Sequence, residues 1–427
     1  VIGAGAAGLM SAKELADKGK KVLVLEARER AGGRIFTMKE KAGLLEAGAE
    51  FIHGRLPLTL GLLEKANANI LLVKGNNYIV RNNYLSKGDF FIEGWDDLLA
   101  KLKGLKEDIS LQEFLDTRFA SPGYANLRKS VIEFVEGYDA ADISKVSALA
   151  IRDEWLADNV SLDFRIKEGY DCLIKYLENE IIVKGGSINY STIVKEILWS
   201  RGNVEVMTNR DICFHAQKVI IAVPIGVLQS SKQPASILFN PPIPPNVYQA
   251  IHQIGYGAVI KFVFVFKEPF WLDYFDKNGK HHKLDNPSFI FSNAFIPTWW
   301  TQYPSNIPVL TGWIAGKNAL KISSWNTQQL LEKAVESISL LFHVSTEWIY
   351  EQLLEQKVFN WVADPFTMGG YTYSSIGSAE VRKVLSTPIN DTIYFAGEGV
   401  YEGPEMGTVE AALVSGKRAA DKVTLSI

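Results

Sequence analysis

The sequence predicts an α/β domain built on a buried parallel sheet, with a second, α+β part inserted into it as a mixed sheet flanked by helices. The chain opens on a strand end and a glycine-rich turn, followed by an Ala-rich helix over Leu9–Asp17 and a buried strand over Lys21–Leu25. Similar short apolar strands recur far downstream, at Val219–Val223 and Thr392–Gly397, before a final helix over Thr408–Val423. The 427 residues also exceed the roughly 250–300 that a single core supports.

The composition is that of an ordinary globular protein. Hydrophobic residues make up 47% of the chain and charged residues 22%, which excludes an intrinsically disordered protein. The net charge of -3 gives no general attraction to nucleic acid. No apolar run approaches the roughly 18 residues that suggest a membrane span.

Neither the cysteines nor the histidines predict a metal site or a disulfide. Cys172 and Cys213 are far apart in the sequence, and no Cys-x-x-Cys occurs. We therefore expect neither a disulfide framework nor a zinc–thiolate site. The 6 histidines show no ligand spacing, so no metal is indicated.

The first residue is Val1, which stands close to the end of a strand. A strand of this kind should begin several residues earlier, so we expect further residues upstream. A targeting peptide would lie among them, which leaves the compartment undetermined, with the cytoplasm as the default for a soluble chain.

A nucleotide-binding pattern occupies the first eight residues. Gly3, Gly5 and Gly8 have the spacing G-x-G-x-x-G between a strand and a helix. Gly3 permits the tight turn, Gly5 lets a pyrophosphate approach the backbone, and Gly8 allows the helix to pack closely on the strand. The N–H groups at the helix start, around Ala7, can face the phosphates. Glu26 ends the next strand and can accept hydrogen bonds from a ribose, but this pattern does not separate NAD from FAD.

Two further segments extend the pattern. Ala27 and Arg28 follow Glu26, and Arg34 follows a second glycine pair that could hold a diphosphate from the other side. Small residues from Gly48 onward would let a flat ring lie against the backbone. With these segments the chain resembles the flavin-containing amine oxidase family, which includes monoamine oxidases, polyamine oxidases, L-amino acid oxidases and lysine-specific histone demethylases. The resemblance implies bound FAD, contacted by Gly3, Gly5, Ala7, Gly8, Glu26, Ala27, Arg28, Gly33, Arg34, Gly48, Ala49, Glu50 and Phe51.

The resemblance also implies a discontinuous division into domains. We expect a Rossmann-like FAD-binding domain at residues 1–70, 186–230 and 385–427, and a substrate-binding domain at residues 71–185 and 231–384. The stretch Ile220–Leu228 is similar to the place where family members leave the FAD domain through a proline turn. The resemblance covers most of the chain and is weakest from about residue 71 to residue 165.

Lys261 opens a strand of alternating aromatic and β-branched residues. From the residues alone, such a lysine caps the strand and extends its ammonium group to solvent. The resemblance implies instead that Lys261 reaches a water molecule beside the flavin N5 and assists reoxidation by dioxygen.

Trp361 and Tyr371 lie in a segment, Trp361–Tyr373, that is similar to one in histone demethylases and polyamine oxidases. The resemblance makes Tyr371 one wall of an aromatic cage that favours amines, and places Trp361 beside it. The alternative is that both are core aromatics. Gly370 stands where monoamine oxidases carry the cysteine that binds FAD covalently, so we expect non-covalent FAD.

A last set of residues surrounds the start of the C-terminal helix, whose free N–H groups could stabilise a reduced, anionic flavin. The resemblance places these residues, and one strand residue upstream, at the cofactor: Val194, Gly397, Glu398, Gly407, Thr408, Val409 and Ala412. Thr408, counted among the catalytic residues, stands where many amine oxidases have an aromatic side chain. The cage therefore lacks that second aromatic wall and leaves room for a longer substrate.

His53 lies in an Ile-His-Gly segment similar to one that lines the substrate channel of animal polyamine oxidases. The resemblance implies that His53 contacts the substrate, and the alternative is a structural histidine. Glu50, Glu402 and Glu405 could attract cationic amines, or they could be solvated loop charges.

The expected activity is oxidation of a polyamine or monoamine to an imine by hydride transfer to FAD. The imine is then hydrolysed, and dioxygen is reduced to hydrogen peroxide. An L-amino acid oxidase is the first alternative, although the context of Arg55 does not match the carboxylate clamp of that subfamily. A carbon–carbon desaturase is a second alternative, and a non-catalytic flavoprotein scaffold is an alternative of another class. The expected partners are an amine and dioxygen, without nucleic acid, and the oligomeric state is undetermined.

Overall fold

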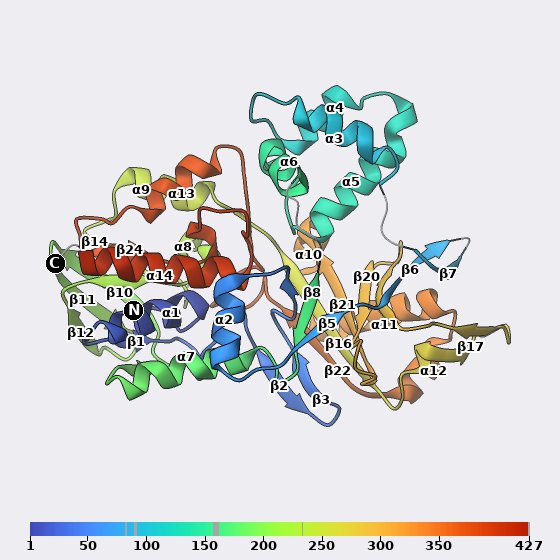
Figure 1. Ribbon diagram of the computed structural model, residues 1–427, viewed down its shortest axis with the longest axis horizontal. Coiled ribbons are helices and arrows are strands. Elements are labelled where there is room, and N and C mark those ends of the chain that lie inside the picture. The colour runs from blue at the N-terminus through green and yellow to red at the C-terminus, as the bar shows by residue number, and fades with distance from the viewer. Residues whose placement is uncertain (82, 89–91, 157–161, 233, 426–427) are drawn as a thin grey trace.

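The structure is a computed structural model that describes residues 1–81, 83–88, 92–156, 162–232 and 234–425. A parallel sheet forms one body of the molecule (Figure 1). Its order is β9 (Ser187–Asn189), β1 (Leu23–Leu25), the segment at Ile2, β13 (Val219–Ile221) and β24 (Ile393–Phe395). Ile2 joins the two halves, since its N–H donates to the Ile220 carbonyl at 2.8 Å while the Gly3 N–H donates to the Leu25 carbonyl at 2.8 Å. The strands expected in the three remote segments therefore meet in one sheet.

Helices cover one face of this sheet. They are α1 (Ala6–Asp17), α2 (Pro57–Lys65), α7 (Asp171–Val183) and α14 (Val409–Leu425). A side chain at Gly416 of α14 would place its Cβ 2.2 Å from the Ala7 carbonyl oxygen, so the glycine permits close packing of α14 on α1. Leu173 and Leu177 of α7 lie in the same core as α1. The expected division assigns residues 71–185, which include α7, to the substrate-binding domain. We propose instead that α7 be counted with the parallel sheet.

The opposite face carries a β-meander and several shorter helices. The meander consists of the antiparallel strands β12 (Cys213–Ala216), β11 (Asn203–Thr208) and β10 (Val194–Ser200). β14 (Leu238–Asn240) pairs parallel with β10 at its edge. The helices are α8 (Ile225–Gln229), α9 (Pro245–Gln253), α13 (Ser378–Ser386) and the 3₁₀ turn Glu398–Val400. Alternating side chains build both cores, because Val24 and Ile220 face the helices while Leu25 and Ile221 face the meander.

A mixed seven-stranded sheet forms the second body. Its order is β22 (Leu353–Asn360), β16 (Val259–Phe266), β21 (Val309–Ala315), β20 (Thr298–Thr301), β19 (Pro287–Phe291), β6 (Asn76–Arg81) and β7 (Tyr84–Lys87). Only the β19–β6 pair is parallel. The sheet shares a core with α10 (Gly316–Ile322), α11 (Thr327–Phe342), α12 (Thr346–Gln352) and the 3₁₀ turn Phe270–Leu272.

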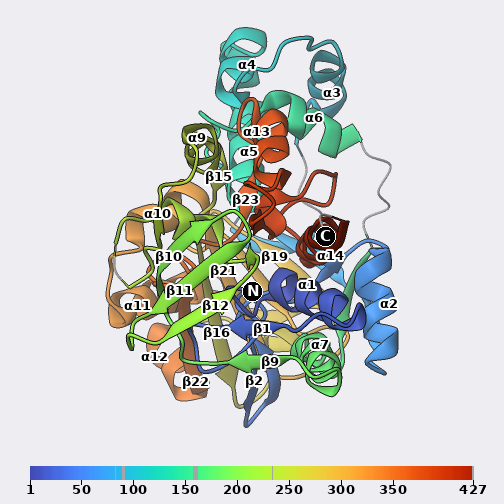
Figure 2. The same cartoon turned by 90° about the vertical axis from the view of Figure 1, so that its left-hand side faces the viewer.

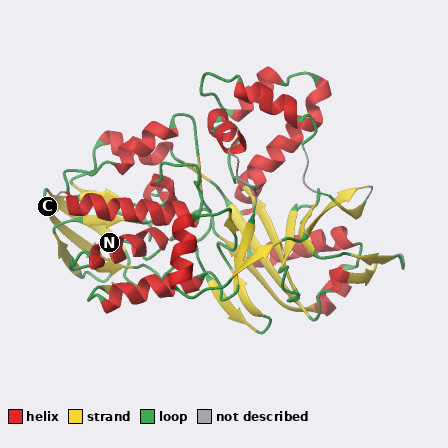
Figure 3. Ribbon diagram, in the orientation of Figure 1, coloured by secondary structure: helices red, strands yellow, loops and turns green. Residues whose placement is uncertain are grey.

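A helical group with its own core stands beside the mixed sheet (Figure 3). It comprises α3 (Trp95–Lys103), α4 (Leu111–Arg118), the 3₁₀ turn Pro122–Tyr124, α5 (Ala125–Gly137) and α6 (Ala148–Leu156). Among the described residues, none of the helices is both long and apolar enough to cross a membrane.

Short sheets connect these parts. They are the hairpin β2 (Thr37–Glu40) with β3 (Gly43–Glu46), the sheet β4 (Ile52–His53), β8 (Asp163–Ile166) and β5 (Ile70–Val73), the pair β15 (Gly255–Tyr256) with β23 (Thr372–Tyr373), and the pair β17 (Asp273–Phe275) with β18 (His281–Lys283). The sheet of β4, β5 and β8 matters most for function, because it brings His53 and Arg165 toward the mixed sheet.

Candidate active site

The glycine turn before α1 leaves space for a ligand. Gly3 has φ +98°, a conformation that favours glycine, and a Cβ on Gly8 would lie 1.9 Å from the Gly3 carbonyl oxygen. In contrast, apart from each glycine and its two chain neighbours, no heavy atom of the described residues lies within 4 Å of the position that a Cβ would take on Gly5 or on Gly397. No side chain caps the first turn of α1. Free N–H groups beside an open, glycine-walled space fit the diphosphate of a dinucleotide.

Glu26 is held at the end of β1 by two backbone groups. Its Oε2 accepts from the Ala4 N–H at 2.7 Å, and its Oε1 accepts from the Arg28 N–H at 2.9 Å. The carboxylate therefore links the glycine turn to the segment after β1. Each oxygen retains capacity for a further hydrogen bond, which fits the predicted contact with a ribose.

The two arginines expected near a diphosphate both have protein partners. The Arg28 guanidinium forms a paired contact with Asp364, at 3.0 and 2.5 Å, and also donates to Thr367. Arg34 donates to the Gly370 carbonyl at 2.6 Å and to the buried Glu398 at 2.8 Å. These contacts tie the segment that follows β1 to the segment from Asp364 to Gly370.

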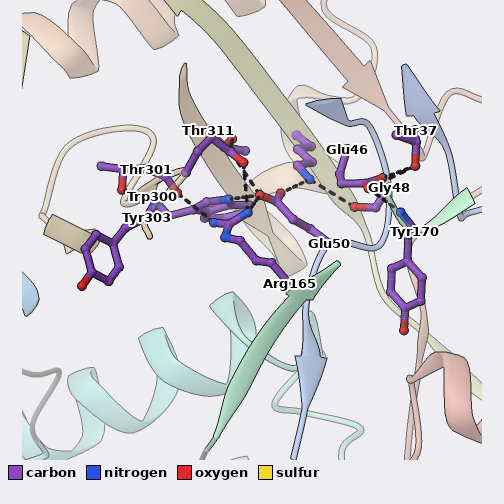
Figure 4. A network of polar contacts seen from close by, with 12 residues as sticks. Thr37, Glu46, Gly48, Glu50, Arg165, Tyr170, Trp300, Thr301, Tyr303 and Thr311 are labelled. Carbon is purple, nitrogen blue, oxygen red and sulfur yellow. Dashed lines mark hydrogen bonds and ion pairs between the residues drawn. The ribbon is translucent and has the colours of Figure 1, made fainter. Parts of the chain in front are cut away.

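Lys261 is the most buried cation of the site. It lies within β16 and is only 1% exposed, so the expectation that it extends to solvent is wrong. Its Nζ donates to Glu50 Oε2 at 2.5 Å and to the Gly48 carbonyl at 3.1 Å. Figure 4 shows Glu50 at the centre of this network, with Arg165 and Trp300 around its carboxylate.

Glu50 balances two cations. Arg165 from β8 is paired with Glu50 Oε1, which also accepts from Trp300 Nε1 at 3.0 Å. Burial alone would raise the pKa of the Glu50 carboxyl, but the charges of Lys261 and Arg165 outweigh it and lower that pKa to about 2. Glu50 is therefore neither a solvated loop charge nor a free group at an entrance, as the sequence had suggested. The cluster of one carboxylate and two cations retains a net positive charge.

A second carboxylate, the half-buried Glu46, lies close to this network (Figure 4). It accepts from the Tyr170 N–H at 2.7 Å and from the Thr37 hydroxyl at 2.8 Å. Burial raises the pKa of the Glu46 carboxyl to about 7, although both hydrogen bonds act in the opposite direction. Glu46 therefore titrates near neutral pH.

Six aromatic side chains form a closed circuit of contacts next to the Glu50 network. Tyr371 and Trp313 are nearly parallel, with centroids 6.4 Å apart and planes at 15°. The contacts continue at centroid distances of 5.8 to 6.0 Å from Trp313 to Trp300, Phe51, His53 and Tyr138. The Tyr371 hydroxyl donates to the Tyr138 carbonyl and closes the circuit. Trp313, on β21, is thus a nearly parallel aromatic neighbour of Tyr371 that the sequence had not predicted.

Two acidic residues lie on the Tyr138 side of this circuit. Oδ2 of Asp139 is buried and has no hydrogen-bond partner among the described residues. Burial, and then the charge of Glu154, raise the pKa of the Asp139 carboxyl well above its usual range. Glu154 is exposed as a residue, yet desolvation by the neighbouring protein raises the pKa of its carboxyl group to about 7. Burial favours the neutral forms of these two carboxyl groups, whereas a cation bound between them would favour their ionised forms, so the pair is suited to a cationic ligand.

The remaining predicted residues have mixed surroundings. Trp361 donates from Nε1 to the Ala47 carbonyl at 3.1 Å and packs with Val259. Thr408 caps α14, since its hydroxyl accepts from the Ala411 N–H at 3.2 Å. His53 pairs with Asp163 at 2.8 Å and lies in the aromatic circuit. Glu398, which follows β24, is buried. Val194 is the first residue of β10 and lies in the core under the meander.

Sequence reasoning missed Arg165, Trp300, Trp313 and Asp139. Arg165, Trp300 and Trp313 meet through pairing between strands that are remote in the sequence, which no local spacing reports. Asp139 follows α5, outside any strand. One signal was available, because a lysine buried in an apolar strand requires a carboxylate partner elsewhere in the chain.

Comparison with known proteins gives a consistent result. A family model described as "Flavin containing amine oxidoreductase" matches residues 6–424. Lysine-specific histone demethylase 1 homolog 2 of Arabidopsis thaliana is 27% identical over 452 residues, covering 99% of this chain and 58% of that protein. Lysine-specific histone demethylase 2 of Homo sapiens is 26% identical over 448 residues, covering 99% of this chain and 53% of that protein. The chain therefore spans about half the length of these curated relatives.

Solved structures resemble the fold over its whole length. Wild-type putrescine oxidase bound to putrescine superposes with a TM-score of 0.78 at 19% identity, covering 99% of this chain and 98% of that chain. Cyclohexylamine oxidase from Brevibacterium oxydans IH-35A gives a TM-score of 0.78 at 18% identity, covering 100% of this chain and 98% of that chain. These likenesses show a shared mixed α/β fold.

Proposed function

The chain belongs to the family of flavin-containing amine oxidoreductases, and we propose that it uses non-covalent FAD to oxidise a diamine or polyamine. Family membership confirms the resemblance inferred from the sequence and makes the chain an oxidoreductase. The substrate, the cofactor's binding mode and the residue roles below are the proposal. The observation that carries the choice of substrate is the buried Oδ2 of Asp139, which has no hydrogen-bond partner among the described residues and interacts electrostatically with Glu154.

The parallel-sheet body is proposed to be the Rossmann-like FAD-binding domain. The open space at Gly5 and Gly397 would take the diphosphate, the N–H groups of α1 would face it, and Glu26 would accept from the ribose. Gly370 carries no thiol, which supports a non-covalent cofactor. Bound FAD would accept two electrons from the amine and deliver them to dioxygen, giving an imine and hydrogen peroxide.

The residues of this chain would bind and orient the amine. Tyr371 and Trp313 provide two nearly parallel aromatic rings beside which an amine can be oriented. Asp139 and Glu154 would bind a second, protonated amino group of the same substrate. Lys261, fixed by Glu50 and Gly48, would supply a buried positive charge that stabilises negative charge developing nearby. Because Glu154 ionises as the pH rises through about 7, binding of a cationic amine should strengthen over that range.

The first test is anaerobic bleaching of the yellow, flavin-loaded chain by diamines, polyamines, monoamines and amino acids. We expect bleaching by diamines and polyamines at lower concentrations than by monoamines of similar size. Bleaching by amino acids alone would favour an L-amino acid oxidase. A yellow protein that no amine or amino acid bleaches would favour a non-catalytic scaffold.

Asp139→Asn tests the choice of substrate. Hydrogen bonds to charged groups contribute about 1.5–3 kcal/mol, so the KM for a diamine should rise roughly 10- to 100-fold while that for a monoamine changes little. Asp153→Asn, at an exposed position of α6, is the matched control and should change neither. An equal effect of Asp139→Asn on diamines and monoamines would remove Asp139 from its proposed role.

A further inference from the structure

Three potential metal ligands meet on the β-meander, away from the candidate active site. β11 and β12 are antiparallel, and their register places Glu205 opposite His215 and Met207 opposite Cys213. Side chains alternate between faces along a strand, so Glu205, Cys213 and His215 share one face. Val204 and Val206 of β11 are buried on the opposite face. The meander lies at one end of the molecule in Figure 1 and faces the viewer in Figure 2.

The three side chains converge closely enough to share an ion. Their ligand atoms all lie within 4.8 Å of one another, and among the described residues this is the one such group of His, Cys, Asp and Glu side chains. Cys213 Sγ and His215 Nε2 are 3.7 Å apart. Tetrahedral zinc, with bonds of about 2.3 Å to sulfur and about 2.0–2.1 Å to nitrogen, would place these two atoms about 3.5 Å apart. The observed separation therefore needs only a small adjustment.

The chemistry of the ligands selects the class of ion. Magnesium and calcium prefer oxygen ligands, whereas a thiolate, an imidazole and a carboxylate together suit a borderline divalent metal. We propose that Glu205, Cys213 and His215 bind one zinc ion. A site with three protein ligands keeps a fourth position open for water or an external ligand. The sequence alone did not indicate this site, because Cys213 and His215 are only two residues apart and Glu205 comes from the neighbouring strand.

The meander presents these ligands to solvent from a rigid support. His215 is exposed, while Glu205 and Cys213 are half-buried, so an ion can enter directly. β11 is paired with β10 on its other side, which fixes the strand that carries Glu205. The backbone ladder and the core hold the meander without an ion, so zinc should add to stability by mass action and is not required for folding. The site does not depend on the proposed amine oxidation.

Cobalt(II) is a direct probe of the site in the purified full chain, kept reduced with a phosphine. We expect one equivalent of Co²⁺ to give the thiolate-to-cobalt charge-transfer absorption and the strong visible bands of a tetrahedral site, and Zn²⁺ to displace both. Cys213→Ser should abolish the charge-transfer absorption and weaken Zn²⁺ binding at least about tenfold, since even changes outside the ligand set cost that much. Cys172→Ser, which removes the other cysteine, and His252→Gln, at an exposed histidine of α9, are the matched controls and should change nothing.

The proposal is overturned if the unsubstituted chain shows no charge-transfer absorption with Co²⁺. It is equally overturned if the absorption survives Cys213→Ser or is lost in Cys172→Ser. Circular dichroism and the melting temperature without metal show whether each variant is folded. Glu205→Gln provides a second test that keeps the thiolate, and it should retain the charge-transfer absorption while lowering the affinity for Zn²⁺ at least about tenfold.

Discussion

Glu50 shows how one buried carboxylate can organise the surroundings of the candidate active site. Lysine is seldom buried without a partner, and Lys261 at 1% exposure is accommodated by Glu50 and the Gly48 carbonyl. Arg165, Trp300 Nε1 and Gln302 Nε2 donate to the other oxygen of the same carboxylate. Removing the charge of Glu50 would therefore leave two buried cations facing each other.

Glu50→Gln should lower the free energy of unfolding by about 3–5 kcal/mol, the usual cost of breaking a buried ion pair by removing one partner. Urea denaturation followed by fluorescence measures this change. Glu380→Gln, which breaks the exposed pair with Lys383 on α13, should produce no measurable change and serves as the control. A loss no larger than that of the control would mean that Lys261 and Arg165 find other partners.

The glycines before α1 permit a second prediction at the residue scale. Gly5 has an ordinary extended conformation and open space where a Cβ would stand, whereas a Cβ on Gly8 would collide with the Gly3 carbonyl. Gly5→Ala should therefore leave the stability of the flavin-free chain unchanged but weaken FAD binding, because the methyl group fills the proposed diphosphate space. Gly8→Ala should destabilise the flavin-free chain itself.

Flavin fluorescence titration and thermal unfolding separate these two outcomes. If Gly5→Ala binds FAD as tightly as the parent chain, the diphosphate does not lie against Gly5. If Gly8→Ala unfolds at the same temperature as the parent chain, the turn before α1 relaxes more easily than its geometry indicates.

At the scale of elements, α2 depends on a residue of another helix. Its N-cap residue, Leu56, has no side chain that can cap the helix. Glu410 of α14 replaces this cap, since its carboxylate accepts from the N–H groups of Leu58 and Thr59 at 3.0 and 2.7 Å and from the Thr59 hydroxyl at 2.6 Å. A negative charge at a helix N-terminus is also favourable for the helix dipole.

Glu410→Gln should destabilise the chain by about 1–3 kcal/mol, because it removes charge-assisted hydrogen bonds to buried donors. Hydrogen exchange should show the loss first at the amides of α2. Glu64→Gln, at an exposed position of α2 itself, controls for a change of charge alone. Exchange in α2 that is no faster in Glu410→Gln than in this control would contradict the capping role.

The elements also show where sequence reasoning works and where it ends. Strands β1, β13 and β24 are buried on both faces, so they form continuous apolar runs that a sequence pattern detects. Residues 194–208, in contrast, read as strand throughout but form the hairpin of β10 and β11, because Arg201 and Gly202 form a turn. Trp313 and Arg165 reach the site through pairing of β21 with β16 and of β8 with β4, and sequence periodicity does not specify which strands pair.

At the scale of the whole molecule, Glu50 and Glu46 make the stability of the fold depend on pH in opposite directions. The folded-state pKa of Glu50, about 2, lies below its usual value of 4.5, so its contribution is complete above 4.5 and is lost as the pH falls toward 2. The folded-state pKa of Glu46, about 7, lies above its usual value of 4.5. Between pH 4.5 and about pH 7, the folded chain therefore holds a proton on Glu46 that the unfolded chain has released. The contribution of Glu46 to stability therefore decreases as the pH rises from 4.5 to about 7.

Glu46→Gln should remove the second of these dependences, because the amide oxygen still accepts from the Tyr170 N–H but carries no titratable proton. Relative to the parent chain, the variant should gain stability between pH 5 and pH 8, by at most about 3 kcal/mol for a shift of this size. Urea denaturation of both chains at pH 5 and pH 8 measures this gain. The free energy of unfolding of the parent chain is subtracted from that of the variant at each pH, which removes the contributions of the titratable groups that both chains share. Glu64→Gln should show the same offset at both pH values, since Glu64 is exposed. If Glu46→Gln also shows a constant offset, Glu46 is ionised throughout this range and its burial is offset by its hydrogen bonds.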